Sequence, residues 1–217
     1  MATRGIVFFD IDGTLVPSGS SSSFLAECFG HQQELDRAES LYAQGELTNQ
    51  QVSEIDARGW HGASTSTVDR WLEDLPLIDG LDAVVSWCRE RHVEPVLASL
   101  AWETVSAWIA ERHRLTSNGG PRVGVVNATF DGTVAAHFDE YDKRDRALRL
   151  ATERGLSPSQ CCAVGDSRSD VPLFEALPAS LALNANTAAR EAATAIVDAT
   201  DLRAILPWLE EWERSLG

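Results

Sequence analysis

The strongest constraint on the fold of this 217-residue chain is an alternation of short apolar runs with longer amphipathic stretches, which begins after Gly80. Apolar runs of four or five residues are typical of buried strands, and apolar residues at three- and four-residue spacing are typical of helices. The pattern predicts strands at 94–98, 122–126, 161–164 and 180–183, and helices at 81–91, 102–112, 144–154, 171–177, 187–195 and 202–212. Asp131-Gly132 has the form of a hairpin turn. Strands alternating in this way with helices form a parallel sheet between two helical layers, so we expect an α/β, Rossmann-like fold.

The N-terminal part of the chain predicts a first strand followed by an insertion. Residues 5–9 are apolar, and 17–23 have the composition of a loop. From Phe24 to about Leu75 the pattern becomes helical and polar, and Thr48 with Gln51 has the form of a capping box. We therefore expect a core domain formed by residues 1–16 and 80–217, with a small helical cap at 17–79 inserted after the first strand.

Charge and composition exclude several classes of protein. The formal net charge is −15, whereas nucleic-acid and anionic-membrane surfaces attract basic proteins. No apolar run approaches the roughly 20 residues of a membrane span, and the N-terminus lacks the pattern of a signal peptide. The four cysteines (Cys28, Cys88, Cys161 and Cys162) have no CxxC spacing, which favours buried free thiols. A cytoplasmic protein is expected, without a nucleic-acid or membrane partner.

Two carboxylates follow the first predicted strand. Asp10 and Asp12 are two residues apart, and Gly13 allows the chain to turn after them. Ligands of such sheets bind at the carboxyl ends of the strands, where two carboxylates in different surroundings can act as nucleophile and as general acid or base. The alternative is a loop that merely favours Asp-Gly.

Further polar residues are expected at the same edge of the sheet. Asp166 and Asp170 follow a later strand and would complete an oxygen site suited to Mg²⁺, or would cap a helix. Lys143 is the only lysine among 18 basic residues, which reflects either codon composition or a need for one compact positive charge beside a phosphoryl group. Ser99 ends a predicted strand and can donate to a phosphate oxygen, although a lone serine there is usually a turn residue.

Together these residues resemble the haloacid dehalogenase superfamily, and within it the phosphoserine phosphatase-like branch. The resemblance rests on four motifs in order: the segment 10–16 (Asp-Ile-Asp-Gly-Thr-Leu-Val), Ser99, Lys143, and the segment 165–170 (Gly-Asp-Ser-Arg-Ser-Asp). It implies a core of this family's fold closed by a helical cap. It also implies a phosphatase that hydrolyses a small phosphorylated metabolite.

The resemblance also implies a role for each matched residue. Asp10 would attack phosphorus, and Asp12 would protonate the leaving oxygen and then activate water. The phosphate would be held by three polar side chains, those of Thr14, Ser99 and Lys143. The Mg²⁺ ion would be bound by Asp10, Asp166 and the backbone carbonyl of Asp12, with Asp170 orienting the site.

The substrate is less constrained than the reaction. Phosphoserine phosphatases carry a glutamate shortly after the first motif, whereas residues 18–21 here are Ser-Gly-Ser-Ser. Arg58 can clasp a carboxylate or be a solvated helix-end residue, and Trp60 and Trp102 can shape a pocket or pack in the core. Transfer of the phosphoryl group to an acceptor other than water stays open, as does a phospho-accepting or binding module without turnover.

Overall fold

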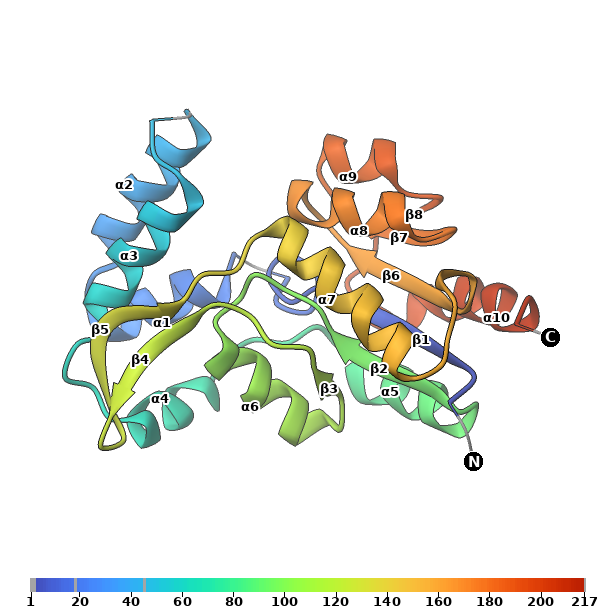
Figure 1. Ribbon diagram of the computed structural model, residues 1–217, viewed down its shortest axis with the longest axis horizontal. Helices are drawn as coiled ribbons and strands as arrows, with labels where there is room; N and C mark the ends of the chain where they lie inside the picture. Colours follow the sequence, from blue (N-terminus) through green and yellow to red (C-terminus); the bar gives the residue numbers. More distant parts are fainter. Residues whose placement is uncertain (1–2, 18, 45, 217) are drawn as a thin grey trace.

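The computed structural model describes residues 3–17, 19–44 and 46–216, so residues 1, 2, 18, 45 and 217 of the expected domains lie outside the described residues. Within the described part, six strands form one parallel sheet in the order β3-β2-β1-β6-β7-β8. These strands are β1 (Gly5–Phe9), β2 (Val93–Leu97), β3 (Thr116–Ser117), β6 (Cys161–Gly165), β7 (Ala179–Leu183) and β8 (Ala195–Val197). The central strand β1 is buried along its length and pairs with β2 and β6 (Figure 1). The predicted parallel α/β sheet is confirmed.

Helices cover both faces of this sheet. They are α5 (Leu81–Glu90), α6 (Glu103–His113), α7 (Glu140–Glu153), α8 (Val171–Ala176), α9 (Thr187–Ala192) and α10 (Leu206–Arg214), with short 3-10 helices at Pro158–Gln160, Arg168–Asp170 and Leu202–Ile205. Successive side chains of a strand point to opposite faces. Accordingly, Val7 and Phe9 pack with α5, α6 and α10, whereas Ile6 and Phe8 pack with α7, α8 and α9. Two apolar layers therefore hold the sheet rigidly at its centre.

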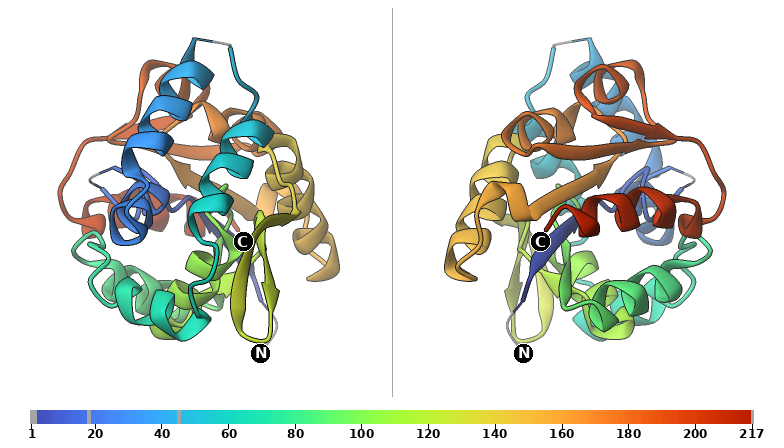
Figure 2. Two further views of the ribbon diagram at one scale, coloured as in Figure 1. Left: turned by 90° about the vertical axis from the view of Figure 1, so that its left-hand side faces the viewer. Right: turned by 90° about the vertical axis from the view of Figure 1, so that its right-hand side faces the viewer.

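In the described residues, four helices lie between β1 and α5: α1 (Ser21–Phe29), α2 (Gln32–Ala43), α3 (Asn49–Gly59) and α4 (Thr65–Leu72). The predicted capping box is present, because the Thr48 hydroxyl accepts from the Gln51 N–H and the Gln51 side chain accepts from the Thr48 N–H. Helices α2 and α3 lie side by side at one end of the molecule (Figures 1 and 2). The insertion therefore stands beside the sheet and not within it.

The strand at residues 122–126 does not join the main sheet. It is β4 (Arg122–Val126), and it pairs antiparallel with β5 (Thr129–Ala136) in a separate hairpin. The backbone of this hairpin bonds to the insertion, since Gly62 N donates to Phe130 O and Phe130 N donates to Ala63 O, both at 2.9 Å. Figures 1 and 2 show β5 running along α3. The apolar run was recognised as a strand, but local pattern does not specify its partner.

The predicted hairpin turn at Asp131-Gly132 is wrong. The chain reverses at Asn127 and Ala128, both with positive φ (49° and 59°), as a two-residue hairpin turn requires. Asp131 and Gly132 lie inside β5, where the pairing register is irregular. The helix predicted at 187–195 is also too long, because α9 ends at Ala192 and Ala195 begins the edge strand β8. In the described residues no helix has the length and apolarity needed to cross a membrane.

Candidate active site

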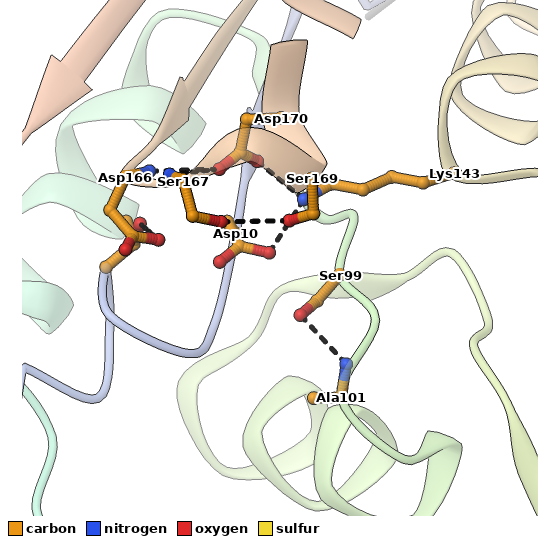
Figure 3. Close-up of polar contacts among 9 residues, drawn as sticks. Asp10, Ser99, Ala101, Lys143, Asp166, Ser167, Ser169 and Asp170 are labelled. Atoms are coloured by element: carbon orange, nitrogen blue, oxygen red, sulfur yellow. Dashed lines mark hydrogen bonds and ion pairs between the residues drawn. The ribbon is translucent and has the colours of Figure 1, made fainter. Parts of the chain in front are cut away.

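The polar residues predicted from the four motifs lie at the carboxyl edge of the central strands. Asp10 follows β1, Asp166 follows β6, and Ser99 lies two residues after β2. The edge is held by the sheet itself, because Asp10 N donates to Val164 O at 2.9 Å and Ala98 N donates to Phe9 O at 2.8 Å. Figure 3 shows Asp10, Asp166, Asp170 and Lys143 gathered at this edge. The parallel register therefore brings together motifs that are far apart in the sequence.

Lys143 lies in the first part of α7 and reaches into this group. Its ammonium donates to Asp10 Oδ1 at 2.7 Å and to Asp170 Oδ1 at 2.5 Å (Figure 3). The lysine side chain is 1% exposed. Burial lowers the pKa of Lys143, but the charges of Asp10 and Asp170 outweigh it, so its pKa lies above the usual value. The ammonium is therefore a permanent positive charge directed at the site.

The position of Lys143 follows from the way α7 begins. The Asp139 side chain caps the helix by accepting from the N–H groups of Tyr141 and Asp142. In return, the Asp142 side chain accepts from the N–H of Asp139. Such reciprocal capping defines the first turn of a helix. The lysine side chain consequently points toward β1 and not into solvent.

The carboxylates of the site repel one another and are partly removed from water. The pKa of Asp10 is raised, mainly by burial. The positive charge of Lys143 opposes this rise in pKa, and the negative charges of Asp170 and Asp166 add to it. Burial, followed by the charge of Asp170, raises the pKa of Asp166 to about 7. A further positive charge at this edge would favour the ionised form of both groups.

Three of these carboxylates suit a metal ion. Single oxygen atoms of Asp10, Asp166 and Asp170 all lie within 4.8 Å of one another. An all-oxygen, anionic donor set fits Mg²⁺. Asp170 is already fixed in place, because its Oδ2 accepts from the N–H groups of Asp166 and Ser167 at 3.0 Å while its Oδ1 accepts from Lys143. Asp170 therefore joins Lys143 to the backbone of the loop that follows β6.

The turn after β1 needs a glycine at position 13. Gly13 has φ +84°, and a Cβ there would lie 2.2 Å from Asp166 Oδ2. The following Thr14 is buried, with its hydroxyl 3.4 Å from Asp166 Oδ1. The lack of a side chain at Gly13 therefore permits both the positive φ of the turn and the close approach of Asp166 to the turn.

Asp12 is bonded to the insertion and is not part of the cluster formed by Asp10, Asp166 and Asp170. Its Oδ1 accepts from the N–H of Ser21 at the start of α1, at 2.7 Å. Burial raises the pKa of Asp12, although the Ser21 N–H opposes this. A raised pKa favours the protonated form that a general acid needs. Asp10 and Asp12 thus lie in different surroundings despite their proximity in the sequence.

Ser99 is buried, and its Oγ accepts from the N–H of Ala101 at 3.1 Å (Figure 3). This contact leaves the hydroxyl proton of Ser99 available for another acceptor. The loop conformation is thus compatible with the expected phosphate contact.

The three residues suggested for substrate selection fall in different places. Trp102 is buried and lines a cavity next to Asp12. Trp60 is fully buried and packs against Phe29 and Phe130, so its ring belongs to the core. Arg58 is exposed on α3 and does not line this cavity among the residues described. Of the three, only Trp102 lines the cavity beside Asp12.

Asp56 was missed by the sequence analysis. It is a buried carboxyl group whose Oδ2 accepts from Trp102 Nε1 at 2.7 Å and whose Oδ1 lies 2.8 Å from His31 Nε2 and 3.3 Å from Trp60 Nε1. It also lines the cavity next to Asp12. An aspartate on a polar helix carries no local signal of burial, and its partners come from separate segments.

Comparison with known proteins adds to this geometry. A family model described as haloacid dehalogenase-like hydrolase matches residues 7–175. The chain is 25% identical over 194 residues to phosphoserine phosphatase SerB2 of Mycobacterium tuberculosis, covering 89% of this chain and 47% of that protein. It is 22% identical over 212 residues to the phosphoserine phosphatase of Lactococcus lactis, covering 97% and 98% of the two chains. The chain thus spans about half of the first relative and nearly all of the second.

Solved structures show the same fold. A structure described as a phospho-aspartyl intermediate analogue of phosphoserine phosphatase superposes with a TM-score of 0.83 at 20% identity, covering 95% of this chain and 99% of that one. The similarity extends over the sheet and the helical insertion alike, because nearly the whole of each chain is covered.

Proposed function

Because this chain belongs to the haloacid dehalogenase-like hydrolase family, we propose that it is a Mg²⁺-dependent phosphatase that hydrolyses a small phosphomonoester through a phosphorylated Asp10. The observation that carries the proposal is the environment of Asp10, a buried carboxylate held 2.7 Å from the Lys143 ammonium at the edge where the metal-binding carboxylates meet. Phosphoryl transfer requires positioning and positive charge more than covalent assistance, and this edge offers both.

In the first step an Asp10 oxygen attacks phosphorus, and the bond from phosphorus to the leaving oxygen breaks. Asp12 donates its proton to that oxygen, so a neutral alcohol leaves. The raised pKa of Asp12 supports this role, since the group must carry a proton before the step. Lys143 stays charged throughout and offsets negative charge on the phosphoryl oxygens, which Thr14 and Ser99 also help to bind.

In the second step the Asp12 carboxylate takes a proton from water, and the water oxygen attacks phosphorus. The bond from phosphorus to Asp10 breaks, and inorganic phosphate leaves. A bound Mg²⁺ would add positive charge against the phosphoryl oxygens. We propose that Asp10, Asp166 and the backbone carbonyl of Asp12 hold it, with Asp170 orienting Asp166 and Lys143.

We further propose that residues 17–79 form a cap over this site, with 1–16 and 80–217 as the core. Two contacts between the regions support this division: Ser21 N–H to Asp12 at 2.7 Å, and Trp102 Nε1 to Asp56 at 2.7 Å. A third contact joins Arg168 to the hydroxyl of Tyr42. A cytoplasmic location is part of the proposal, supported by the free thiols of Cys28, Cys88, Cys161 and Cys162.

The test is release of inorganic phosphate from an aryl phosphate with Mg²⁺ and no added acceptor. We expect turnover that EDTA abolishes and Mg²⁺ restores, and a loss of more than about 1,000-fold in Asp10→Asn. Asp69→Asn, which changes an exposed carboxylate on α4, is the matched control. Turnover that needs an alcohol acceptor, and that forms the phosphate ester of that alcohol in place of inorganic phosphate, would identify a transferase instead. Stable phosphorylation without turnover would identify a phospho-accepting module. Full activity of Asp10→Asn would refute the mechanism.

A further inference from the structure

A cavity of about 180 Å³ adjoins Asp12, and its lining does not include Asp10, Asp166 or Asp170. It lies between the cap and the core, and its walls include Asp12, Ser20, Glu39, Asp56, Leu100 and Trp102. Asp12 is the group proposed to protonate the leaving oxygen, so the rest of the leaving group must occupy this space. The volume is below the roughly 300–1,000 Å³ of sites for drug-sized ligands. The cavity therefore suits a leaving group of only a few atoms.

The charge of the cavity is entirely acidic among the described residues. Besides Asp12 it contains the carboxyl groups of Glu39 and Asp56, and its lining includes no lysine, arginine or histidine. Arg58 is exposed outside it, and Arg168 contacts Tyr42 in a different pocket. The basic group in contact with this lining is the His31 ring, which lies behind Asp56 and is already bonded to it at 2.8 Å. A substrate carboxylate placed here would therefore meet like charges first.

The carboxyl groups of Glu39 and Asp56 are placed to face an organic cation and not a second metal ion. Among the described residues, the oxygen atoms close enough to share one ion belong to Asp10, Asp166 and Asp170, a set that excludes Glu39 and Asp56. Asp56 is held rigidly by Trp102, Trp60 and His31, and it keeps free lone pairs. The indole of Trp102 adds an aromatic wall, and such walls attract ammonium groups when water is excluded.

Glu39 is an exposed residue of the cavity lining, and its pKa responds to carboxylates both inside and outside that lining. Partial removal from water is the first cause that raises the pKa of Glu39, followed by the charges of Asp36, Asp56 and Asp12. Like charges that repel across a small space are relieved by a positive group between them. A cationic ligand would therefore bind with electrostatic gain in this cavity, whereas a neutral one would not.

We propose that the physiological substrate is a small phosphomonoester whose leaving group carries an ammonium group and no carboxylate, with Glu39 and Asp56 as the groups that select it. This inference rests on the proposed phosphatase function and narrows its substrate class. It also distinguishes the chain from its relatives named phosphoserine phosphatases, since phosphoserine carries a carboxylate beside its amine.

The experiment compares four substrates of similar size under the same Mg²⁺ concentration: 2-aminoethyl phosphate, 2-hydroxyethyl phosphate, phosphoglycolate and O-phosphoserine. We expect kcat/KM for 2-aminoethyl phosphate to exceed that for 2-hydroxyethyl phosphate by roughly tenfold, the scale of one charge-assisted contact. Both should exceed phosphoglycolate and O-phosphoserine. Binding of the same compounds to Asp10→Asn, measured by calorimetry, should follow the same order without turnover.

The matched variants are Glu39→Gln and Glu34→Gln. Both glutamates are exposed residues of α2, but Glu34 lies in the first turn and does not line the cavity. We expect Glu39→Gln to reduce the ratio of kcat/KM for 2-aminoethyl phosphate to kcat/KM for 2-hydroxyethyl phosphate toward one. Glu34→Gln should leave that ratio unchanged. Equal kcat/KM values of the wild type for 2-aminoethyl phosphate and 2-hydroxyethyl phosphate would overturn the inference, as would a preference for phosphoglycolate or O-phosphoserine. In either case, turnover of an aryl phosphate would leave the proposed phosphatase function intact. Loss of turnover on every substrate, aryl phosphate included, would refute both.

Discussion

The ammonium of Lys143 lies 2.7 Å from Oδ1 of Asp10, although the two residues are separated by 133 positions in the sequence. Both side chains are almost completely buried, at 1% and 4% exposure. An ion pair removed from water in this way is costly to disrupt at one end, because the other charge is left without a partner. This relationship makes the single lysine of the chain a sensitive position.

Replacement of Lys143 by arginine should reduce kcat by more than about 100-fold, in the range of a lost electrostatic contact to the transition state. The charge is kept, but the broad planar guanidinium cannot occupy a space that fits one ammonium between Asp10 and Asp170. Steady-state kinetics on an aryl phosphate would measure this. Arg146→Lys, the reverse exchange at an exposed position of α7, should retain activity. Near-normal kinetics of Lys143→Arg would mean that the geometry of the lysine is unimportant.

Stability without metal should depend on pH through Asp166. Its pKa in the folded protein is raised from 3.8 to about 7, mainly by burial and by Asp170. Between these values the folded state binds a proton that the unfolded state has released, so stability falls as pH rises from about 4 to about 7. In EDTA, Asp166→Asn should therefore lose less in Tm between pH 5 and pH 7.5 than the wild type.

Mg²⁺ at pH 7.5 should raise the Tm of the wild type, because a ligand that binds only the folded state stabilises it. The same addition of Mg²⁺ should raise the Tm of Asp166→Asn much less. Thermal denaturation with and without EDTA measures both effects. Identical pH and Mg²⁺ responses in the two proteins would show that Asp166 is not part of a metal site.

Gly13→Ala should abolish activity and Mg²⁺ binding. The new Cβ would lie 2.2 Å from Asp166 Oδ2, in addition to the strain of a φ of +84°. Gly30→Ala is a matched control, since Gly30 has φ +82° and no atom within 4 Å of the added carbon. Both variants should lose stability through backbone strain, of the order of 1 kcal/mol. If Gly30→Ala lost activity as completely as Gly13→Ala, the contact with Asp166 would not be the cause.

Trp102→Phe should destabilise the protein more than Trp108→Phe. Trp102 Nε1 donates to the buried Asp56 at 2.7 Å, whereas Trp108 Nε1 is buried and has no hydrogen-bond partner among the described residues. Both changes remove a similar volume, but the first leaves a buried carboxyl oxygen without its donor, at a cost of about 1–3 kcal/mol. Urea denaturation monitored by circular dichroism would measure the difference. Equal losses would indicate that the bond between cap and core contributes nothing to stability.

Much of the fold was predictable because its signals are local. The apolar run at residues 5–9 is a central strand, the run at 161–164 is its neighbour, and Thr48 caps a helix as its spacing with Gln51 indicated. The errors occur where pairing is decided elsewhere. The strand at 122–126 has the composition of any strand, but its partner is β5 and its support is α3. The predicted helix at 187–195 ends on Ala195, the first residue of the edge strand β8, because a strand of three residues has no period to detect.

The set of carboxylates that meet at Asp10 could be predicted from the sequence. A parallel sheet places the carboxyl ends of its strands at one edge, so residues that follow separate strands must meet there wherever they occur in the chain. Asp10, Asp166 and Asp170 illustrate this rule. The surroundings of Asp12 depend on long-range packing. Asp56 and Glu39 lie on polar helices whose composition does not indicate which residues face the core. The packing of the insertion against the core places them in the cavity lined by Asp12 and leaves Arg58 out of its lining. Strand order therefore brings Asp10, Asp166 and Asp170 together, whereas the cavity next to Asp12 is formed by segments that have no local signal for each other.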